Sequence, residues 1–549
     1  MPPIVGFIDM DCFYVAVERA RDKRLHGKPC AVVQYPTGQR GRRDLRPEDD
    51  RWRTGGAMGG IIAVSYEARA KGVMRQMSGH EAMKVCPEII LVQVPTAFGK
   101  ADLQIYKEAG DAVVELLAQR CDATEKRSVD EVAIDVTSEA QRLLSQQSFE
   151  ELRGLAQKAS HLADSALSKA AANVTRSEAR QGHQKQQTRN MSALADGWEE
   201  VFHRFSSDLT VQRLIAGAVV VKDLRAEVES VLGFTCSGGV ATNKILAKLG
   251  CGLHKPNQQT LLLPHAASAL LKDLPLDRLP GLGGDFGQAV KTRLEVETAG
   301  QVLQVPREVM KHFPQKGEWL LALAAGEDSA AEAVKDRQLV KSLSNGKTFF
   351  GDKRLRSLAE VDYWLGELSG ELHRRYQKQV EKHQRTPTTL GVSLTTEHRK
   401  DTSGAKDHCT RQQSINLGST GTVEQILTTA KTLVRRAGDV SDVVVLGLCL
   451  SNMIPLEGNG SLSKYFGKSA EGKGAKAEAA KEKAKPKANL LSASFARAAK
   501  REAPTTMNQE IDEGILAELP LNIQEEIRKE MGKEPRAKKL CADVVEIDA

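Results

Sequence analysis

The chain opens with an unbroken apolar run that ends in acids. Residues 4–8, Ile-Val-Gly-Phe-Ile, carry no polar side chain, which is the pattern of a strand buried on both faces. Asp9 and Asp11 follow directly. A carboxylate at the end of a buried strand is costly unless it is protonated, paired with a cation or bound to a metal. This stretch therefore predicts a site that needs a partner.

A helical pattern begins just after these acids, over about 13–21. The backbone amides of Cys12, Phe13 and Tyr14 are then expected at a helix N-terminus, where they can bind a phosphate. A metal site and a phosphate site would adjoin at the end of the first strand.

A second acidic pair, Asp130-Glu131, precedes a run of alternating apolar residues. Successive side chains of a strand face opposite ways, so the two acids can meet at one site only where the chain turns sharply. We predict a hairpin tip there, followed by a strand with one buried face. Asp9, Asp130 and Glu131 would repel one another unless cations lay among them, which predicts a Mg²⁺ site. For either segment alone, a strand end with solvated acids is an equal alternative.

The patterning predicts further elements as far as about residue 452, interrupted by a polar loop at 36–59 and by a Gln- and Ser-rich region at 140–195 with helical pieces at best. The expected elements are a strand at 29–35, a strand feeding a helix at 61–75, helices at 102–120 and 209–232, a strand–glycine turn–helix unit at 234–248, and, after a charged link at 327–337, a separate α+β unit with strands at 342–350, 388–396, 412–417 and 443–450 and helices at 358–382 and 422–436.

Two of these units carry candidate phosphate ligands. Tyr66 and Arg69, spaced i and i+3, would share one helical face and could grip a polyphosphate, although Arg69 could instead pair with Glu67 or face solvent. Lys244 and Lys248 follow the glycine turn one helical turn apart; either could neutralise a leaving pyrophosphate or be a plain surface charge.

Two further segments suggest contacts with a DNA backbone. Residues 274–284, rich in Leu, Pro and Gly, resemble the glycine hairpin of helix-hairpin-helix modules, whose amides hold a DNA phosphate. The helix predicted at 358–382 carries basic residues that could reach a phosphate backbone or form a solvated face. They are His373, Arg374, Arg375 and Lys378.

Composition limits the number of domains, the kind of partner and the cellular compartment. A chain of 549 residues suggests three or four domains, and a net charge of +7 with a pI near 8.8 fits a nucleic-acid partner without requiring one. Nine cysteines lie scattered without a CxxC pair, so we expect reduced thiols and no zinc site. The start lacks a basic segment with a long apolar core, and no run of about 18 apolar residues exists; a soluble intracellular protein is expected.

The last hundred or so residues change character. The Lys-, Ala- and Glu-rich stretch 468–487 predicts a disordered tail. Before it, 462–466 has the form of a sliding-clamp-binding peptide, except that Asn459 stands where that motif usually has Gln. After it, 511–531 is amphipathic around Leu519-Pro520 and suggests a docking peptide, and a basic cluster at 535–540 is of the kind used for nuclear import.

Together these motifs resemble those of the Y-family translesion DNA polymerases, most closely the eta branch. The resemblance covers about residues 1–452 in order and spacing. The motifs that carry it lie at 9–14, 31–35, 60–70, 128–131 and 239–257.

The resemblance implies an α+β, multidomain, right-hand polymerase fold. Its expected parts are a palm (1–13 and 100–257), fingers (14–99), a thumb (258–335), a little finger (336–452) and a disordered regulatory tail (453–549). The implied activity is template-directed DNA synthesis past damage such as cyclobutane pyrimidine dimers, in the nucleus, with primer-template DNA and dNTPs as substrates.

The resemblance also implies residue roles. Asp9, Asp130 and Glu131 would be catalytic and hold two Mg²⁺ ions, with the Met10 carbonyl as a further ligand and Mn²⁺ as an alternative ion. Tyr66, Arg69 and Lys255 match triphosphate-binding positions, next to the amides of Cys12, Phe13 and Tyr14. Tyr14 also matches the steric gate that excludes a ribose 2′-hydroxyl, or it is a core aromatic. Gln34 and Arg75 match positions near the template and incoming bases.

The chain departs from relatives in two places. The insertion at 36–59 lies in the fingers, and the tail has no Cys/His set for the ubiquitin-binding zinc finger of many relatives. Leu519-Pro520 instead resembles the zinc-free ubiquitin-binding motif of other members, which implies ubiquitin or a ubiquitylated clamp as partner. The alternatives are a palm-fold nucleotidyl cyclase, which has no use for a DNA-binding hairpin, and a non-catalytic scaffold recruited by clamp and ubiquitin.

Overall fold

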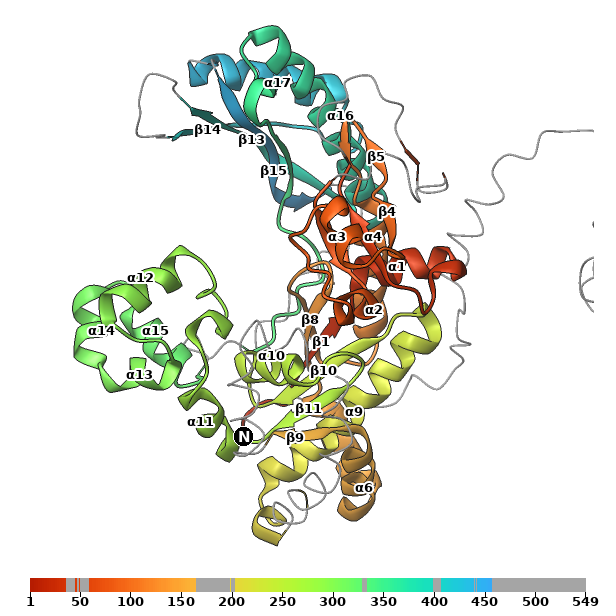
Figure 1. The fold of residues 1–549 in the computed structure, drawn as a ribbon, viewed down its shortest axis with the longest axis vertical. Coiled ribbons are helices and arrows are strands. Elements are labelled where there is room, and N and C mark those ends of the chain that lie inside the picture. Colours follow the sequence, from red (N-terminus) through yellow and green to blue (C-terminus); the bar gives the residue numbers. More distant parts are fainter. Residues whose placement is uncertain are drawn as a thin grey trace, which may run out of the picture. The chain divides into compact units, whose positions relative to one another are not determined.

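A computed structural model describes the protein at residues 1–35, 45–46, 49, 59–163, 198, 203–327, 333–397, 406–438, 440 and 442–456. The described part is a mixed α/β chain organised around several sheets (Figure 1). Within these residues, no helix combines the length and the apolar character needed to cross a lipid bilayer. The eight described cysteines are all free thiols.

A six-stranded sheet of order β7-β8-β1-β10-β11-β9 organises the first half of the chain. The apolar run predicted at 4–8 lies in its middle as β1, Val5–Met10, between antiparallel neighbours. The other strands are β7 (Ala123–Lys126), β8 (Glu131–Asp135), β9 (His161–Ala163), β10 (Cys236–Ala241) and β11 (Gln259–Leu262).

Helices cover both faces of this sheet, which explains the unbroken apolar run of β1 (Figure 1). Ile4 and Ile8 belong to the core that includes α9 (Leu209–Leu232), whereas Val5 and Phe7 belong to the core that includes α10 (Lys244–Leu253). On the α9 side, α4 (Gln104–Leu117), α5 (Thr137–Gln146) and α6 (Phe149–Ala159) add a further layer.

One expectation for this region is wrong, and a second is incomplete. The strand after Glu131 was expected to have one buried face, but Val132, Ala133 and Ile134 are all fully buried because α10 covers the second face. The region from 140 was expected to contain helical pieces at best; α5 and α6 are such pieces, and the short strand β9 that follows them was not expected.

A smaller module follows β1. Helix α1 (Phe13–Arg21) leads through η1 (Lys23–Leu25) to a three-stranded sheet of order β3-β2-β4. Its elements are β2 (Cys30–Val33), β3 (Ile61–Val64), α2 (Tyr66–Ala70), α3 (Gly79–Val85) and β4 (Ile90–Gln93), followed by the short pair β5 (Thr96–Ala97) and β6 (Lys100–Ala101). The strands and helices predicted at 13–35 and 61–75 are thereby confirmed.

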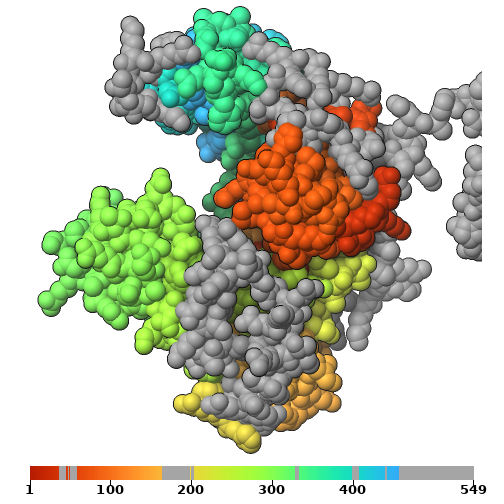
Figure 2. Space-filling view, in the orientation of Figure 1, coloured from red at the N-terminus to blue at the C-terminus, as the bar shows by residue number. Residues whose placement is uncertain are grey.

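Short helices dominate residues 264–324. They are α11 (Pro264–Lys272), η3 (Leu276–Arg278), α12 (Asp285–Leu294), α13 (Ala299–Gln304), α14 (Pro306–His312) and α15 (Gly317–Ala324). They form one continuous green surface in the space-filling view (Figure 2). Gly281 sits at the turn before α12 with a φ of 86°, a backbone conformation that favours glycine, against the ring of Trp319.

A four-stranded antiparallel sheet of order β12-β15-β13-β14 forms the last described unit. Its strands are β12 (Leu343–Thr348), β13 (Arg385–Glu397), β14 (Lys406–Ser414) and β15 (Val443–Pro455). The short 3₁₀ helix η4 (Gly351–Lys353) follows β12. Helices α16 (Leu358–His383) and α17 (Val423–Ala437) pack on the sheet and share its core. The predicted helices are confirmed, but the strand expected at 412–417 lies earlier, because β14 pairs with β13 from Glu397 back to Thr389.

The segment that leads into this last unit is tied to the free edge of β7. The Arg337 amide donates to the Thr124 carbonyl at 3.0 Å, and the Lys126 amide donates to the Arg337 carbonyl at 3.0 Å. Backbone pairing at an edge strand satisfies groups that would otherwise be open. The link predicted at 327–337 thus ends in an isolated parallel bridge between Arg337 and Glu125 at the edge of the six-stranded sheet.

A buried carboxylate holds the same junction. Glu125 on β7 accepts hydrogen bonds from Arg127 at 2.7 Å, Lys244 at 3.1 Å and the Lys335 amide at 3.2 Å. Burial alone would raise its pKa, but these hydrogen bonds lower the pKa of Glu125 to about 2. Lys244 is therefore a structural ion-pair partner, and its predicted role in neutralising pyrophosphate is not supported by this position.

Candidate active site

The two acidic segments meet at one end of the six-stranded sheet. Asp9 lies directly opposite Glu131 in the β1–β8 ladder, so their side chains share one face. The Met10 amide donates to the Asp130 carbonyl at 3.0 Å, and the Arg127 amide donates to the Glu131 carbonyl at 2.9 Å across a tight turn. The hairpin tip predicted at Asp130 is confirmed.

Helix α4 supports this tip closely. A Cβ at Gly110 would lie 2.2 Å from the Val129 carbonyl oxygen, so only glycine allows the approach. The Ser128 hydroxyl then donates to the Asp130 carboxylate at 2.5 Å. Helix α4 thus packs against the hairpin tip, and Asp130 lines the same cavity as Asp9.

Lysines balance the negative charge of these acids. Lys255 Nζ lies 2.5 Å from the Asp9 carboxylate, and Lys248 Nζ binds both oxygens of Glu131 at 2.8 and 2.7 Å. Burial raises the pKa of Asp9; Lys255 opposes this, while Glu131 and Asp130 add to it. Burial alone would lower the pKa of Lys255, but Asp9 raises it. Asp9 therefore lies close enough to Glu131 and Asp130 for their charges to act on it.

The donor set fits a hard divalent cation. Carboxylate and carbonyl oxygens are the ligands that Mg²⁺ takes, and Asp9 and Glu131 are each partly exposed and already bound to a cation. Within the described ranges, however, no three histidine, cysteine or acidic side chains are gathered as a ready-made metal site. An ion would have to take the place of Lys255 at Asp9, so the predicted Mg²⁺ ligands Asp9, Met10, Asp130 and Glu131 stay a prediction.

Most of the predicted site residues line one cavity of about 480 Å³, here called the β1 cleft. Glu131 and Gln34 are not among its lining residues. The predicted residues that line it are Asp9, Met10, Cys12, Phe13, Tyr14, Tyr66, Arg69, Arg75, Asp130 and Lys255. Segments far apart in the sequence thus supply one concave, charged site.

The N-terminus of α1 opens at this cleft. The helix begins at Phe13 without a side-chain cap, after Cys12 in a left-handed conformation with a φ of 39°. An uncapped helix start leaves backbone amides available to an anion. Burial raises the pKa of the Cys12 thiol to about 12, so Cys12 is protonated near neutral pH and contributes its backbone rather than a thiolate.

Tyr14 is fixed within the cleft wall. Its ring stacks on Tyr106 at a centroid distance of 4.2 Å and an interplanar angle of 12°. Tyr106 is fully buried and donates to Glu18. Burial raises the pKa of Tyr14, and the charge of Asp130 raises it further, which places the phenol near the acids. Tyr14 thus lines the cleft with one side of its ring and packs against the core with the other, so its role as a steric gate stays a prediction.

Tyr66 and Arg69 face the same cleft from α2. The guanidinium of Arg69 lies 4.6 Å from the centroid of the Tyr66 ring, and its Nε donates to the Val64 carbonyl at 3.1 Å. Glu67 instead pairs with Arg19 at 2.8 Å, so the alternative of an Arg69–Glu67 pair is wrong. Arg69 remains exposed and directed to the cleft.

Asp11 is a residue whose role was missed. It is 2% exposed and accepts hydrogen bonds from the Ser237 hydroxyl at 2.8 Å, the Asn257 amide at 2.7 Å and the Tyr66 hydroxyl at 3.4 Å. It therefore ties β1 to β10, to the segment after Lys255 and to α2. The sequence carried no signal for this difference, because residues two apart on a strand lie on one face. Asp9 and Asp11 take different roles since β1 ends at Met10 and the chain turns at Cys12 before α1.

Of the other residues predicted to contact bases or DNA, some line the cleft and others do not. Arg75 lines the cleft. Gln34 is half-buried, and its backbone amide donates to the Gly60 carbonyl at 3.0 Å. On α16, Arg374 binds Asp102 at 2.9 Å and Lys378 binds Glu108, so these two contact the protein rather than solvent. The tail peptides, including Leu519 and Pro520, lie outside the described residues.

Comparison with known families agrees with this arrangement. Residues 8–252 match the model of the impB/mucB/samB family, and residues 340–463 match the model of that family's C-terminal domain. The chain belongs to the Y family of DNA polymerases. Residues 274–326 also match the helix-hairpin-helix motif of DNA polymerase eta and Rev1, where the glycine hairpin was predicted.

Individual Y-family relatives span most of the chain. DNA polymerase eta of Arabidopsis thaliana is 36% identical over 422 residues, which are 76% of this chain and 56% of the relative. DNA polymerase eta of Drosophila melanogaster is 35% identical over 68% of this chain and 40% of the relative. DNA polymerase IV of Shewanella frigidimarina is 26% identical over 72% of this chain and 83% of the relative. The chain spans about half the length of the eta relatives that it matches.

Proposed function

We propose that this protein is a template-directed DNA polymerase that performs translesion synthesis, including past cyclobutane pyrimidine dimers. The observation that carries the proposal is the β1 cleft, where Asp9 and Asp130 face Tyr66, Arg69, Lys255 and the uncapped start of α1. Acids beside a set of phosphate-binding groups suit attack of a primer 3′-hydroxyl on the α-phosphate of a dNTP, with release of pyrophosphate.

Asp9, Asp130, Glu131 and the Met10 carbonyl would hold two Mg²⁺ ions. Bound there, such ions lower the pKa of the attacking hydroxyl and stabilise the leaving pyrophosphate. Arrival of the nucleotide gives Lys255 a second anion, so its ammonium can leave Asp9 for the triphosphate.

Other residues of the cleft bind and select the nucleotide. Arg69, Tyr66 and the α1 amides contact the phosphates, and the ring of Tyr14 excludes a ribose 2′-hydroxyl. Arg75 contacts the incoming base, and Gln34 lies toward the template. Because Tyr14 and Arg69 are each held by ring stacking, the cleft is preorganised before substrate binds.

The described units support a right-hand layout, which we also propose. The palm comprises 1–13 and 100–257, the fingers 14–99, the thumb 258–335 and the little finger 336–452, followed by a regulatory tail at 453–549. Two of these bounds fall a few residues short, because β11 (Gln259–Leu262) pairs within the six-stranded sheet and β15 of the last sheet ends at Pro455. The helix-hairpin-helix match falls in the thumb and the C-terminal-domain match in the little finger. A nucleotidyl cyclase would need neither unit, and a scaffold would need no cleft of this chemistry.

Primer extension on four templates tests the proposal. Purified full-length protein with Mg²⁺ is given one dNTP at a time and a template whose next base is A, C, G or T. We expect incorporation to follow the template base, and extension to continue opposite a cyclobutane thymine pair. Incorporation that ignores the template, or synthesis of a cyclic nucleotide without a primer, would overturn the proposal.

For the tail, we propose binding of ubiquitin or a ubiquitylated sliding clamp through Leu519 and Pro520, in the nucleus. Replacing both with alanine is expected to remove ubiquitin binding in a titration and to leave primer extension unchanged. Replacing Lys476 and Lys481 with alanine, in the Lys-, Ala- and Glu-rich stretch outside both tail motifs, serves as the control. An unchanged affinity for ubiquitin in the Leu519→Ala, Pro520→Ala variant would refute this assignment.

A further inference from the structure

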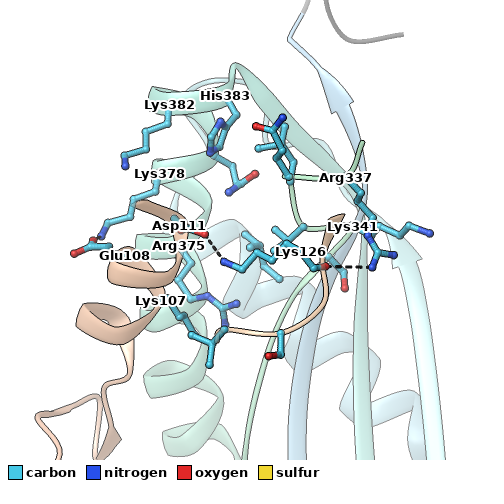
Figure 3. A pocket seen from close by; sticks show the side chains of 18 of the residues that line it. Lys107, Glu108, Asp111, Lys126, Arg337, Lys341, Arg375, Lys378, Lys382 and His383 are labelled. Atoms are coloured by element: carbon cyan, nitrogen blue, oxygen red, sulfur yellow. Dashed lines mark hydrogen bonds and ion pairs between the residues drawn. The ribbon is translucent and has the colours of Figure 1, made fainter. Parts of the chain in front are cut away.

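A second cavity lies on the other side of the hairpin that carries Asp130. Its volume is about 460 Å³, within the usual range for small-molecule sites. It is formed by α4, the tip of the β7–β8 hairpin, the segment from Arg337 to Leu343 and the second half of α16 (Figure 3). We call it the junction pocket. Val129 lines both this pocket and the β1 cleft.

The junction pocket has a strong excess of positive charge. Eight lysine and arginine side chains line it, but only two carboxylates do. Both carboxylates are already paired, Asp111 with Lys126 and Glu108 with Lys378 (Figure 3). Among the residues that the structure describes, Lys107 and Lys382 have no ion-pair partner.

Lys107 is partly buried among these charges. Burial and the charge of Arg375 together lower its pKa to about 8, although Glu371 and Asp102 act in the opposite direction. Arg375 itself uses one guanidinium nitrogen to donate to the Ser344 carbonyl at 2.6 Å, and its nearest carboxylate, on Glu371, is 4.0 Å away. An anion in the pocket would relieve this repulsion.

The walls indicate the size and kind of anion. Leu339, Val340, Leu343 and Val129 form apolar parts of the lining, and glutamine and serine side chains add neutral donors. Cations on several elements that surround a small cavity suit a compact group with several negative oxygens.

We propose that the junction pocket binds a phosphate group, carried by a small polyphosphate. The ligand would bridge α4, the hairpin and α16 and so hold the last sheet unit against the six-stranded sheet. The same chemistry is present in the backbone of a nucleic-acid strand, which the test below distinguishes. The proposal does not depend on the polymerase activity.

Binding of inorganic tripolyphosphate to the full chain, measured by calorimetry, tests this site. Arg69→Ala and Lys255→Ala are introduced first, so that the cations of the β1 cleft do not contribute. In this background, adding Lys107→Gln and Lys382→Gln is expected to weaken binding about tenfold or more. Adding Lys158→Gln and Lys272→Gln, which remove the same charge at exposed positions outside the pocket, is expected to change the affinity less than about twofold.

A charge-keeping variant and a second probe complete the experiment. Lys107→Arg with Lys382→Arg keeps the charge and is expected to retain binding, which separates a charge effect from a folding defect. A single-stranded oligo-dT replaces tripolyphosphate in the second arm. A pocket-dependent loss for tripolyphosphate supports the proposal; a loss for oligo-dT alone assigns the phosphate to a nucleic-acid backbone and overturns the small-ligand source. If the pocket and control variants behave alike with both probes, there is no phosphate site.

Discussion

Replacing Asp130 and Glu131 together with alanine is expected to reduce primer extension by at least about 10³-fold while leaving DNA binding intact. Divalent ions supply several kcal/mol of charge stabilisation in such reactions, and each 1.4 kcal/mol is a factor of ten in rate. The two acids lie at the tip of the β7–β8 hairpin, whereas the glycine hairpin at 274–284, expected to hold a DNA phosphate, lies elsewhere in the chain.

The measurement is single-turnover incorporation, with fluorescence anisotropy for binding to the primer-template. Glu139→Ala with Glu227→Ala is the matched control, because both acids pair with the exposed Arg120 and lie away from the β1 cleft. The variant leaves Lys248 without its ion-pair partner Glu131. Circular dichroism therefore checks that the variant is still folded. Undiminished synthesis by the double variant would rule out these acids as catalytic residues.

Replacing Tyr14 with alanine is expected to raise the incorporation of ribonucleotides relative to deoxyribonucleotides about 10²-fold. The ring of Tyr14 lines the β1 cleft and cannot easily swing away, because it stacks on Tyr106. Removing the ring is expected to open space for a 2′-hydroxyl, while Tyr66 and Arg69, the proposed phosphate-binding residues, are unchanged.

Tyr14→Phe is the matched control, since it keeps the stacked ring and removes only the hydroxyl. Its ratio of kcat/KM values for matched rNTP and dNTP is expected to stay within about threefold of the original, because the ring's bulk, not its hydroxyl, does the excluding. If Tyr14→Ala keeps the original ratio, or if Tyr14→Phe loses it as well, Tyr14 does not act as a steric gate.

Local patterns predicted those elements whose burial is uniform or strictly periodic. The bounds of α1 and α9 agree with the expected 13–21 and 209–232, and β1 lies where the apolar run lies. The hairpin tip at Asp130 was predictable as well, because two adjacent acids cannot share a site on a straight strand.

Long-range pairing could not be predicted from one sequence. Whether Lys244, Lys248 or Lys255 faces an acid depends on strand register, and the structure pairs them with Glu125, Glu131 and Asp9 respectively. The ion pairs of α16 could not be predicted for the same reason. Asp102 and Glu108 precede their partners Arg374 and Lys378 by about 270 residues. The added edge pairing of Arg337 with β7 likewise has no local signal.

The central claim is that Asp9, Asp130 and Glu131 gather around divalent ions when primer and nucleotide are present. Anomalous diffraction from crystals of the protein with primer-template DNA, a non-hydrolysable dNTP and Mn²⁺ tests it most directly. The account predicts two manganese peaks bridged by these carboxylates, with Lys255 moved from Asp9 to the triphosphate. Manganese bound elsewhere, with Lys255 still on Asp9, would contradict it.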